Sequence, residues 1–454
     1  MVTSDPRAGR GRRRARRDWG KTWARLLCVL FALVGIVPLT GGLVLRLRPL
    51  QEWAASETSR VLREQLGVEA TFQVELNLIP LRLAVTDLVV PATDGGTPAV
   101  RTRLAAVSPR FFSLLAGRLD VGDIELEDSA VRLVVRSGKL TNVAYRLPER
   151  PKSDDDSALS RSPFRSVTMT NARVDLDIDG THVVTDAIDL DAFAEPDLSF
   201  DVALRVAGAT SSSTHTRKNG EISHDEDRLC ALDLRTHLSR DLITIRRFSL
   251  LGALDLDGAP DTRPGCDSEG AERVAVRLSQ FKITPRPSGR PWLRGRVMAR
   301  TPAAISNRFV KMGEFTGWAG FAGEIAWDDS TRLPEVSGQL SGEKLHMAEF
   351  QITEHIAGTV LISGDVVRIP NLEAEWGNGR AHIHDFKLEP FAPRIPFTAR
   401  HIESWDIDFP GIMEAIGVTN NTIVDWNYDH VDIRDTRGAV SPFFLDGAVN
   451  AQTS

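Results

Sequence analysis

A run of twenty uncharged residues, 26–45 (LLCVLFALVGIVPLTGGLVL), constrains this chain more than any other feature. As a helix rising ~1.5 Å per residue, the run covers the roughly 30 Å hydrocarbon layer of a bilayer. The alternative is a cleaved secretory signal, whose apolar run is roughly 7–15 residues long and ends in an A-x-A-like site. Here the best small-residue site, around residues 53–56, lies well beyond the run. The sequence therefore predicts an uncleaved transmembrane helix at 26–45.

The charges on either side of this run predict its orientation. Residues 1–25 contain two acidic residues, Asp5 and Asp18, against nine basic ones: Arg7, Arg10, Arg12, Arg13, Arg14, Arg16, Arg17, Lys21 and Arg25. Basic flanks stay in the cytoplasm, so we expect 1–25 to be cytoplasmic and 46–454 to be exported. Two alternatives are weaker. A nucleic-acid-binding arm has no nucleic-acid-binding fold beside it, and a twin-arginine export signal at 16–21 is poorly matched at Gly20.

Charge and cysteine content limit what the exported body can do. The whole chain has a formal charge of −6 and residues 1–25 contribute +7, which leaves −13 on residues 26–454. A mildly acidic body argues against binding nucleic acid or an acidic surface. Cys28 lies in the predicted span, so Cys230 and Cys266 are the cysteines outside it. In an oxidising compartment these two either form a disulfide or remain as two buried thiols.

The residues directly after the span, 46–67, have the pattern of an amphipathic connecting helix. Apolar residues, Trp53 among them, recur at roughly helical spacing within Pro49–Leu66. Pro49 suits a first helical turn, and Gly67 suits a C-terminal stop. The acidic residues of the segment would face anionic headgroups if the helix lay on a membrane. We therefore expect the helix to pack on the first strands of the body instead.

From Val68 the hydrophobic period changes from 3.6 to 2, which predicts a β region over 68–147. In its first run, Phe72, Val74, Leu76 and Leu78 alternate with polar residues, and Pro80 ends the run. Later strands are predicted at 81–90, 100–107, 119–127 and 130–136. The region therefore reads as a series of short strands joined by turns.

Residues 50–145 resemble the amino-terminal region of the AsmA-like family, which includes AsmA and TamB. The resemblance rests on the order of several loose motifs: an apolar span, an amphipathic helix ending in Leu66-Gly67, a strand broken at Pro80, and then LRLAVTDLVV (81–90), FSLLAGRL (112–119), VGDIEL (121–126) and GKLTN (138–142). Ser129-Ala130 stand where the family often has a proline. The detailed match covers about a fifth of the chain.

Two further regions follow the first one along the chain. Residues 148–165 (PERPKSDDDSALSRSPFR) are rich in proline, serine and charge, as is typical of a linker. Residues 166–332 contain alternating runs and two polar stretches, 211–228 and 259–271, which we expect to be loops. From 333 to 454 strand-like runs, among them Val336–Leu340 and Lys344–Met347, follow at regular intervals of ~8–12 residues, which predicts roughly 25–30 strands in the whole chain.

The body contains no segment of helix length with a 3.6-residue period, which argues against most α/β enzymes. The recurring glycine turns favour a quasi-repeating β-array in which each unit contacts its neighbours. Another strand-like unit begins at Phe443, and no capping element follows it. This pattern favours a β-array that continues beyond residue 454.

Two constellations look chemical but fit strands better. Asp175, Asp177 and Asp179 match the start of a calcium loop, yet they also alternate with apolar residues in a strand that ends at Gly180. His382 and His384 share a strand face, but no companion cluster is evident in the sequence. G-x-S-x-G, P-loop, H-E-x-x-H and zinc-type Cys/His motifs are also missing. We therefore predict no catalytic site, no metal site and no cofactor.

The combined prediction is a mainly β protein: a single N-terminal transmembrane helix followed by a long, curved, mostly antiparallel sheet with a few short helices. The resemblance to AsmA-like proteins implies a bacterial inner-membrane protein with its body in the periplasm. It also implies a role in envelope biogenesis, with phospholipid acyl chains carried along an apolar groove between inner and outer membranes. A scaffold for outer-membrane protein assembly, working with an outer-membrane partner, is the alternative. An exported enzyme is a third.

Alternation in the regular region predicts which side chains line that groove. The expected lining residues are Val336, Leu340, Leu345, Met347, Ile352, Val360, Ile362, Val367, Ile369, Leu372, Ala374, Trp376, Ile383 and Leu388. Glu343, Arg368, Glu373 and Glu375 should lie on the other face. An ordinary dry core, with a second layer filling the space, would produce the same alternation.

Overall fold

The computed structural model describes most of residues 48–452. The described residues are 48–61, 63–64, 67–78, 81–110, 121–143, 162, 164–216, 222–255, 266, 272–286, 291–308, 315–328, 331–347, 350–376, 379–407, 428–440 and 443–452. The predicted cytoplasmic tail (1–25) and span (26–45), nearly all of the linker at 148–165, and most of 259–271 lie outside these ranges. Within them, no helix combines the length and apolarity needed to cross a membrane.

Twenty-two described strands form a single sheet. The helices are α2 (Arg48–Val61) and the 3-10 helix η2 (Ala303–Arg308), and the strands are β1 (Thr71–Leu78), β2 (Leu81–Val90), β3 (Val100–Pro109), β4 (Val121–Arg136), β5 (Lys139–Leu140), β6 (Ser166–Ile178), β7 (Thr181–Thr185), β8 (Ile188–Ala194), β9 (Phe200–Val206), β10 (Ala209–Thr216), β11 (Ile222–Leu238), β12 (Ile243–Asp255), β13 (Glu272–Thr284), β14 (Trp292–Pro302), β15 (Phe315–Trp327), β16 (Glu335–Met347), β17 (Phe350–Ser363), β18 (Val366–Trp376), β19 (Gly379–Leu388), β20 (Pro396–Ile407), β21 (Tyr428–Val440) and β22 (Phe443–Gln452).

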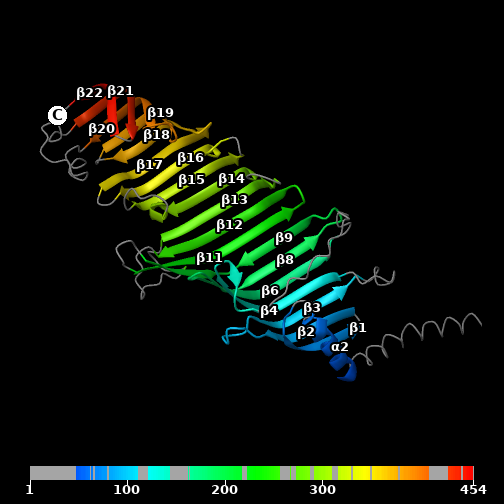
Figure 1. Ribbon diagram of the computed structural model, residues 1–454. Coiled ribbons are helices and arrows are strands. Elements are labelled where there is room, and N and C mark those ends of the chain that lie inside the picture. Colours follow the sequence, from blue (N-terminus) through cyan, green and yellow to red (C-terminus); the bar gives the residue numbers. More distant parts are fainter. Residues whose placement is uncertain are drawn as a thin grey trace, which may run out of the picture.

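The strands follow one another in chain order along an elongated sheet, from β1 at one end to β22 at the other (Figure 1). From β11 to β22 every strand pairs antiparallel with the next one. The same holds from β1 to β4. The predicted mainly β, mostly antiparallel fold is therefore confirmed.

One pair in the sheet is parallel. Strand β6 runs parallel to β4, with Ile124 opposite Val167 and Val135 opposite Ile178. A parallel pair needs a crossover connection rather than a tight turn. The predicted linker, 148–165, falls between these two strands in the sequence and supplies the length for that crossover. The sheet itself continues through this point, so hydrogen bonding joins the first β region to the second.

Between β6 and β11, two positions in the sheet are each filled by two strands lying end to end. Strands β8 and β7 both pair with β6, and β9 and β10 both pair with β11. Where they meet, the Asp186 N–H donates to the Gly208 carbonyl (2.7 Å) and the Ala207 N–H donates to the Ala187 carbonyl (2.8 Å). The loop prediction for 211–228 is therefore wrong for 211–216 and 222–228, while 217–221 lie outside the described residues. Backbone pairing, rather than apolar burial, holds its Ser-, Thr- and Asp-rich residues in β10 and β11.

β-Bulges reverse the side-chain alternation inside several long strands. Asp128 in β4 has a left-handed backbone (φ 49°), as does Asn171 beside it in β6 (φ 53°). Arg103 forms ion pairs with both Glu127 and Asp128, so these two consecutive residues point to the same face. On a regular strand they would point to opposite faces. The bulge keeps the apolar residues before and after it on one face.

Two predicted strand boundaries turn out to be bulges. The described part of the first run, 121–127, and the run 130–136 belong to a single strand, β4, with Asp128 at the bulge. Val336–Leu340 and Lys344–Met347 likewise belong to β16, with Lys344 at φ 49°. A bulge breaks the period-2 pattern without breaking the hydrogen-bonded ladder, so the sequence divides some strands that the structure joins.

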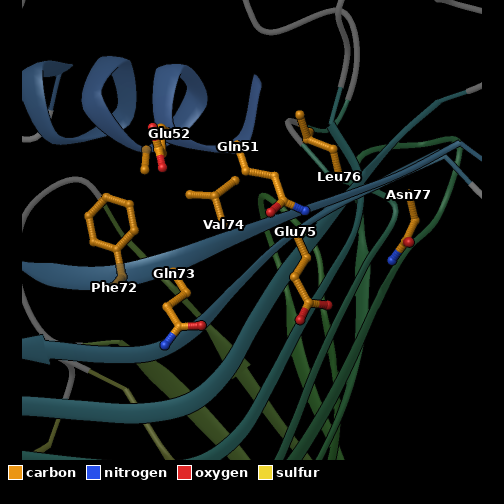
Figure 2. A pocket seen from close by; sticks show the side chains of 9 residues that line it. Gln51, Glu52, Phe72, Gln73, Val74, Glu75, Leu76 and Asn77 are labelled. Carbon is orange, nitrogen blue, oxygen red and sulfur yellow. The ribbon is translucent and has the colours of Figure 1, made fainter. Parts of the chain in front are cut away.

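Helix α2 lies against β1, at the N-terminal end of the sheet. Figure 2 shows Phe72, Val74 and Leu76 on the side of β1 that faces α2, whereas Gln73 and Glu75 point the other way. The helix therefore packs on the first strand, as its sequence predicts. One difference is Trp53, which the apolar pattern places on the packed stripe but which is 64% exposed.

Candidate functional site

The two faces of the sheet differ sharply in chemistry along its whole length. Residues that are directly paired on neighbouring strands share a face, so the register connects side chains into rows that cross the sheet. Three such rows lie side by side on the face that α2 covers at one end. They contain almost only apolar residues and glycine, and we call this surface the apolar face.

The three rows are named here by their first residues. The Leu76 row comprises Leu76, Leu83, Val107, Ile124, Val167, Ala192, Val202, Thr236, Ile245, Phe281, Gly295, Ile325, Val336, Ile362, Val367, Leu388, Phe397 and Gly438. The Val74 row comprises Val74, Val85, Ala105, Leu126, Met169, Leu190, Leu204, Leu234, Phe248, Leu278, Val297, Gly323, Gly338 and Val360. The Ala172 row comprises Ala172, Ile188, Val206, Leu232, Leu250, Val276, Ala299, Phe321, Leu340, Gly358, Leu372, Ile383, Ile402, Ile433 and Val449.

The opposite face, which we call the polar face, carries charges at the same levels. One of its rows runs through Glu125, Thr168, Asp191, Ala203, Arg235, Arg247, Ser279, Arg296, Glu324, Ser337, Leu361, Arg368, Lys387, Thr398, Arg437 and Asp446. Toward β1 the row continues through Ala106 and Ala84 to Glu75. Its apolar members are these two alanines, Ala203 and Leu361, and the others are charged or carry a hydroxyl, so this face is the solvated one.

Cross-strand ion pairs hold the charges of the polar face. Arg296 pairs with Glu324 at 3.2 Å and Arg437 with Asp446 at 2.8 Å. A hydrogen bond from Arg103, and a second from Asn171, hold the pKa of Asp128 below its ordinary value. Exposed pairs of this kind contribute little stability each, but they keep the carboxylates charged and the face wet.

The apolar face is not a closed core. Among the larger apolar side chains of the three rows, only Val74, Phe281 and Val360 are buried, and Val449 is 64% exposed. The others are half-buried. In a two-layer domain, leucine and isoleucine at these positions would be fully buried. The described residues form one sheet, and the only helices among them are α2 and η2, so they supply no second layer.

Most of the predicted lining residues lie on the apolar face. Val336, Leu340, Val360, Ile362, Val367, Leu372, Ile383 and Leu388 belong to its three rows. Ala374 is paired with Ile356 and Ala381 on the same face. Ile369 is paired with Phe386, whose ring stacks on Phe397 of the Leu76 row. Leu345 reaches the same face beyond the bulge at Lys344, where its side chain packs against Gly342.

The remaining predicted positions divide into two groups. The side chains of Met347, Ile352 and Trp376 lie outside the described ones. The four residues predicted for the other face are all on the polar face. Glu343 forms an ion pair with Arg300 (2.8 Å), Arg368 is in the polar row, and Glu373 and Glu375 are paired with His382 and Arg380.

The calcium-loop-like aspartates and the two cysteines have structural roles. Asp175 and Asp177 lie in β6 and bind His182 and Arg136 rather than converging on one point. A disulfide joins Cys230 and Cys266, with their Cα atoms 5.6 Å apart.

His384 lies on the polar face, directly opposite His401 on β20. The companion cluster that the sequence did not reveal is therefore present, because the register supplies it from the next strand.

A cavity of about 620 Å³ opens between α2 and β1. Gln51, Glu52 and Ala55 of the helix line it together with residues 72–77 of the strand (Figure 2). In the described residues β1 pairs with β2 alone, so the cavity lies where the first strand has an unpaired edge. Its volume is in the range of small-molecule sites in proteins, roughly 300–1,000 Å³.

No protein family model, no curated protein and no solved structure matches this chain.

Proposed function

We propose that this protein is a membrane-anchored envelope protein whose apolar face holds phospholipid acyl chains and carries them along the sheet between inner and outer membranes. The proposal needs a surface that accepts alkyl chains at every point along its length. It also needs that surface to begin beside a membrane and to exclude bulk water only when lipid is bound.

The observation that carries the proposal is the continuity of the three apolar rows on a face that is only half-buried. A sheet with one apolar face must cover it with another layer or present it to an apolar ligand. Each CH₂ group of an acyl chain that leaves water gains ~0.8 kcal/mol. The rows suit an alkyl chain because such a chain has no polar group that would need a hydrogen-bonding partner. Thr236, which is buried, is the single hydroxyl-bearing residue in the three rows.

The N-terminal end of the sheet supports the direction of the proposal. Helix α2 begins at Arg48, a few residues after the apolar run at 26–45 that we predict to be the anchor. The cavity between α2 and β1 is next to Val74 and Leu76, where two of the rows begin. A lipid leaving the anchored membrane would meet this end first.

A second candidate function is a scaffold for the assembly of outer-membrane proteins. In the described residues, β1 pairs only with β2 and β22 only with β21. Each of these strands therefore has an edge that is free to pair with an added strand. A client in a β conformation would bind at these edges, whereas an acyl chain would bind on the apolar face.

One experiment separates the two functions. The full chain is purified from membranes in mild detergent, and the molecules that stay bound are identified by native mass spectrometry. Phospholipid retained by the wild-type chain, but not by variants with a charged apolar face, supports lipid carriage. Retained unfolded β-barrel polypeptide without phospholipid would favour the scaffold.

A further inference from the structure

The polar face of β19, β20 and β21 gathers imidazole and carboxylate groups. His384 of β19 is directly opposite His401 of β20. One position away on the same face, Glu403 of β20 is directly opposite Asp432 of β21. All four side chains therefore project from one small area of the sheet.

The donor atoms in this area lie close together. The His401 Nε2 atom is 3.1 Å from Glu403 Oε1 and 3.0 Å from Asp432 Oδ1. The rings of His384 and His401 are stacked, with centroids 5.8 Å apart. One ligand atom each from His384, His401 and Glu403 lie within 4.8 Å of one another, and all three residues are half-buried. Small side-chain rotations would bring these three atoms around a common centre.

This donor set suits a transition metal. Two imidazoles and a carboxylate are ligands that Zn²⁺ takes at about 2.0–2.2 Å, usually in a tetrahedron. Two ligand atoms at that distance from a tetrahedral ion lie roughly 3.3 Å apart. The 3.1 Å between His401 Nε2 and Glu403 Oε1 is close to this value. Calcium and magnesium, which prefer oxygen ligands throughout, fit the two imidazoles poorly.

We propose that His384, His401 and Glu403 form a binding site for a divalent transition-metal ion, with Zn²⁺ the best match, and that the bound ion links β19 to β20. Asp432 completes the surroundings of the ion. Its side chain is only 11% exposed and binds Arg434 at 2.8 Å.

The chain contains a second cluster that serves as an internal comparison. Glu195, Asp201 and His237 also place one ligand atom each within 4.8 Å. This cluster has a single imidazole, whereas the first has two. Arg246 lies 3.2 Å from Asp201, which is one of its three ligand residues, whereas in the first cluster Arg434 binds Asp432, outside the three. We therefore expect the first cluster, and not this one, to bind the ion.

The test measures zinc binding to the full chain in detergent. A chelator first removes bound metal and is itself removed, and zinc is then added. Isothermal titration gives the affinity, and elemental analysis gives the number of ions per chain. Wild-type protein should bind one more Zn²⁺ than His384→Ala or Glu403→Gln at micromolar free zinc. Where residual binding at this site is measurable, its Kd should rise about tenfold or more. Zinc should also raise the melting temperature of the wild type and not of these variants.

Two matched controls keep the test decisive. His355→Ala removes an exposed imidazole from the polar face of β17, away from the triad, and His237→Ala removes the imidazole of the second cluster. Both should bind zinc as the wild type does, and circular dichroism should give the same β spectrum for every variant. Equal zinc binding by wild type and His384→Ala, or loss of the ion in His237→Ala alone, would overturn the proposal.

Discussion

Leu361 and Ile362 are consecutive residues of β17 with side chains of equal size, yet they lie in opposite chemical surroundings. Ile362 lies between Val336 and Val367 on the apolar face, whereas Leu361 lies between Ser337 and Arg368 on the polar face. Both side chains are half-buried. This pair therefore allows the two faces of the sheet to be compared at the same level of the same strand.

A charge on the apolar face should remove bound lipid without unfolding the protein. Ile362→Asp places a carboxylate where two or three CH₂ groups of an acyl chain would lie. The lipid should lose ~2 kcal/mol of binding free energy, which lowers its occupancy about thirtyfold. Leu372→Asp, two rows away, should act in the same way. Because the apolar face is half-exposed, the carboxylate can hydrate and the β spectrum should persist. Leu361→Asp is the control and should retain wild-type amounts of phospholipid.

The same variants distinguish an open face from a dry core. In a closed core, Ile362→Asp would bury an unpaired charge at a cost of several kcal/mol, enough to unfold a domain of ordinary stability. Circular dichroism melts of Ile362→Asp and Leu361→Asp should instead lie within a few degrees of each other. A collapsed melt for Ile362→Asp alone, with no lipid in the wild type, would mean that a second layer covers the face.

Gly338 should not accept a larger residue, because its backbone packs closely against β15. A Cβ atom at Gly338 would lie 2.6 Å from the Ala322 carbonyl oxygen and 2.8 Å from the Phe321 ring. Gly338→Val should therefore lower stability by about 1–3 kcal/mol. The control is Gln339→Val, which puts the same side chain on the exposed polar face. Chemical denaturation of both variants checks this, and equal midpoints would contradict the close approach.

The Cys230–Cys266 disulfide should stabilise the middle of the sheet. It closes a loop with a sequence separation of 36 residues, for which the chain-entropy model gives about 3–4 kcal/mol. Thiol labelling of denatured, non-reduced protein should modify Cys28 alone, and the reduced protein should melt earlier. Labelling of all three cysteines without reductant would show that the bridge does not form in the native protein.

The bulge at Asp128 should make stability sensitive to acid. Arg103, and then Asn171, hold the pKa of Asp128 below its ordinary value in the folded state. A carboxylate with a depressed folded pKa contributes stability above its unfolded pKa of about 3.9, and that contribution is lost as pH falls through the folded pKa. The urea concentration at the unfolding midpoint of the wild type should therefore decrease as the pH is lowered below about 4.

Asp128→Asn should remove the part of this acid dependence that comes from protonation of the Asp128 carboxylate. Asparagine tolerates the left-handed backbone at this position, so the bulge should persist. The measurement is the urea midpoint of both proteins at several pH values between roughly 2.5 and 6. Parallel curves for the two proteins would mean that Asp128 does not contribute through its charge.

The period-2 pattern was sufficient to predict the fold class and the face on which most lining residues lie. In β18 the predicted set includes Ile369 and Leu372, which are three residues apart and share a face because the chain carries an extra residue, Pro370, between them. Alternation alone cannot locate such an insertion, because a bulge looks the same as a strand end. Asp128 and Lys344 mark two places where the sequence divides a continuous strand for that reason.

The features that the sequence missed depend on register between strands. His384 lies near His401 and Glu403 only because β19 and β20 pair in this register. The sequence around residue 384 contains no motif that indicates His401 or Glu403 as its neighbours. The polar composition of 211–228 predicts a loop. Their neighbours on both sides, β7 and β11, provide the backbone partners that keep β10 in the sheet. Neither relationship is local in the chain.

Photocrosslinking along the rows tests the central claim most directly. A photoreactive amino acid is placed singly at Leu83, Leu234, Ile362 and Phe397 on the apolar face, and at Leu361 and Arg368 on the polar face. The account predicts phospholipid adducts from all four apolar-face positions, near both ends and in the middle of the sheet, and none from Leu361 or Arg368. Adducts that are absent from the apolar face, or equally frequent on both faces, would contradict it.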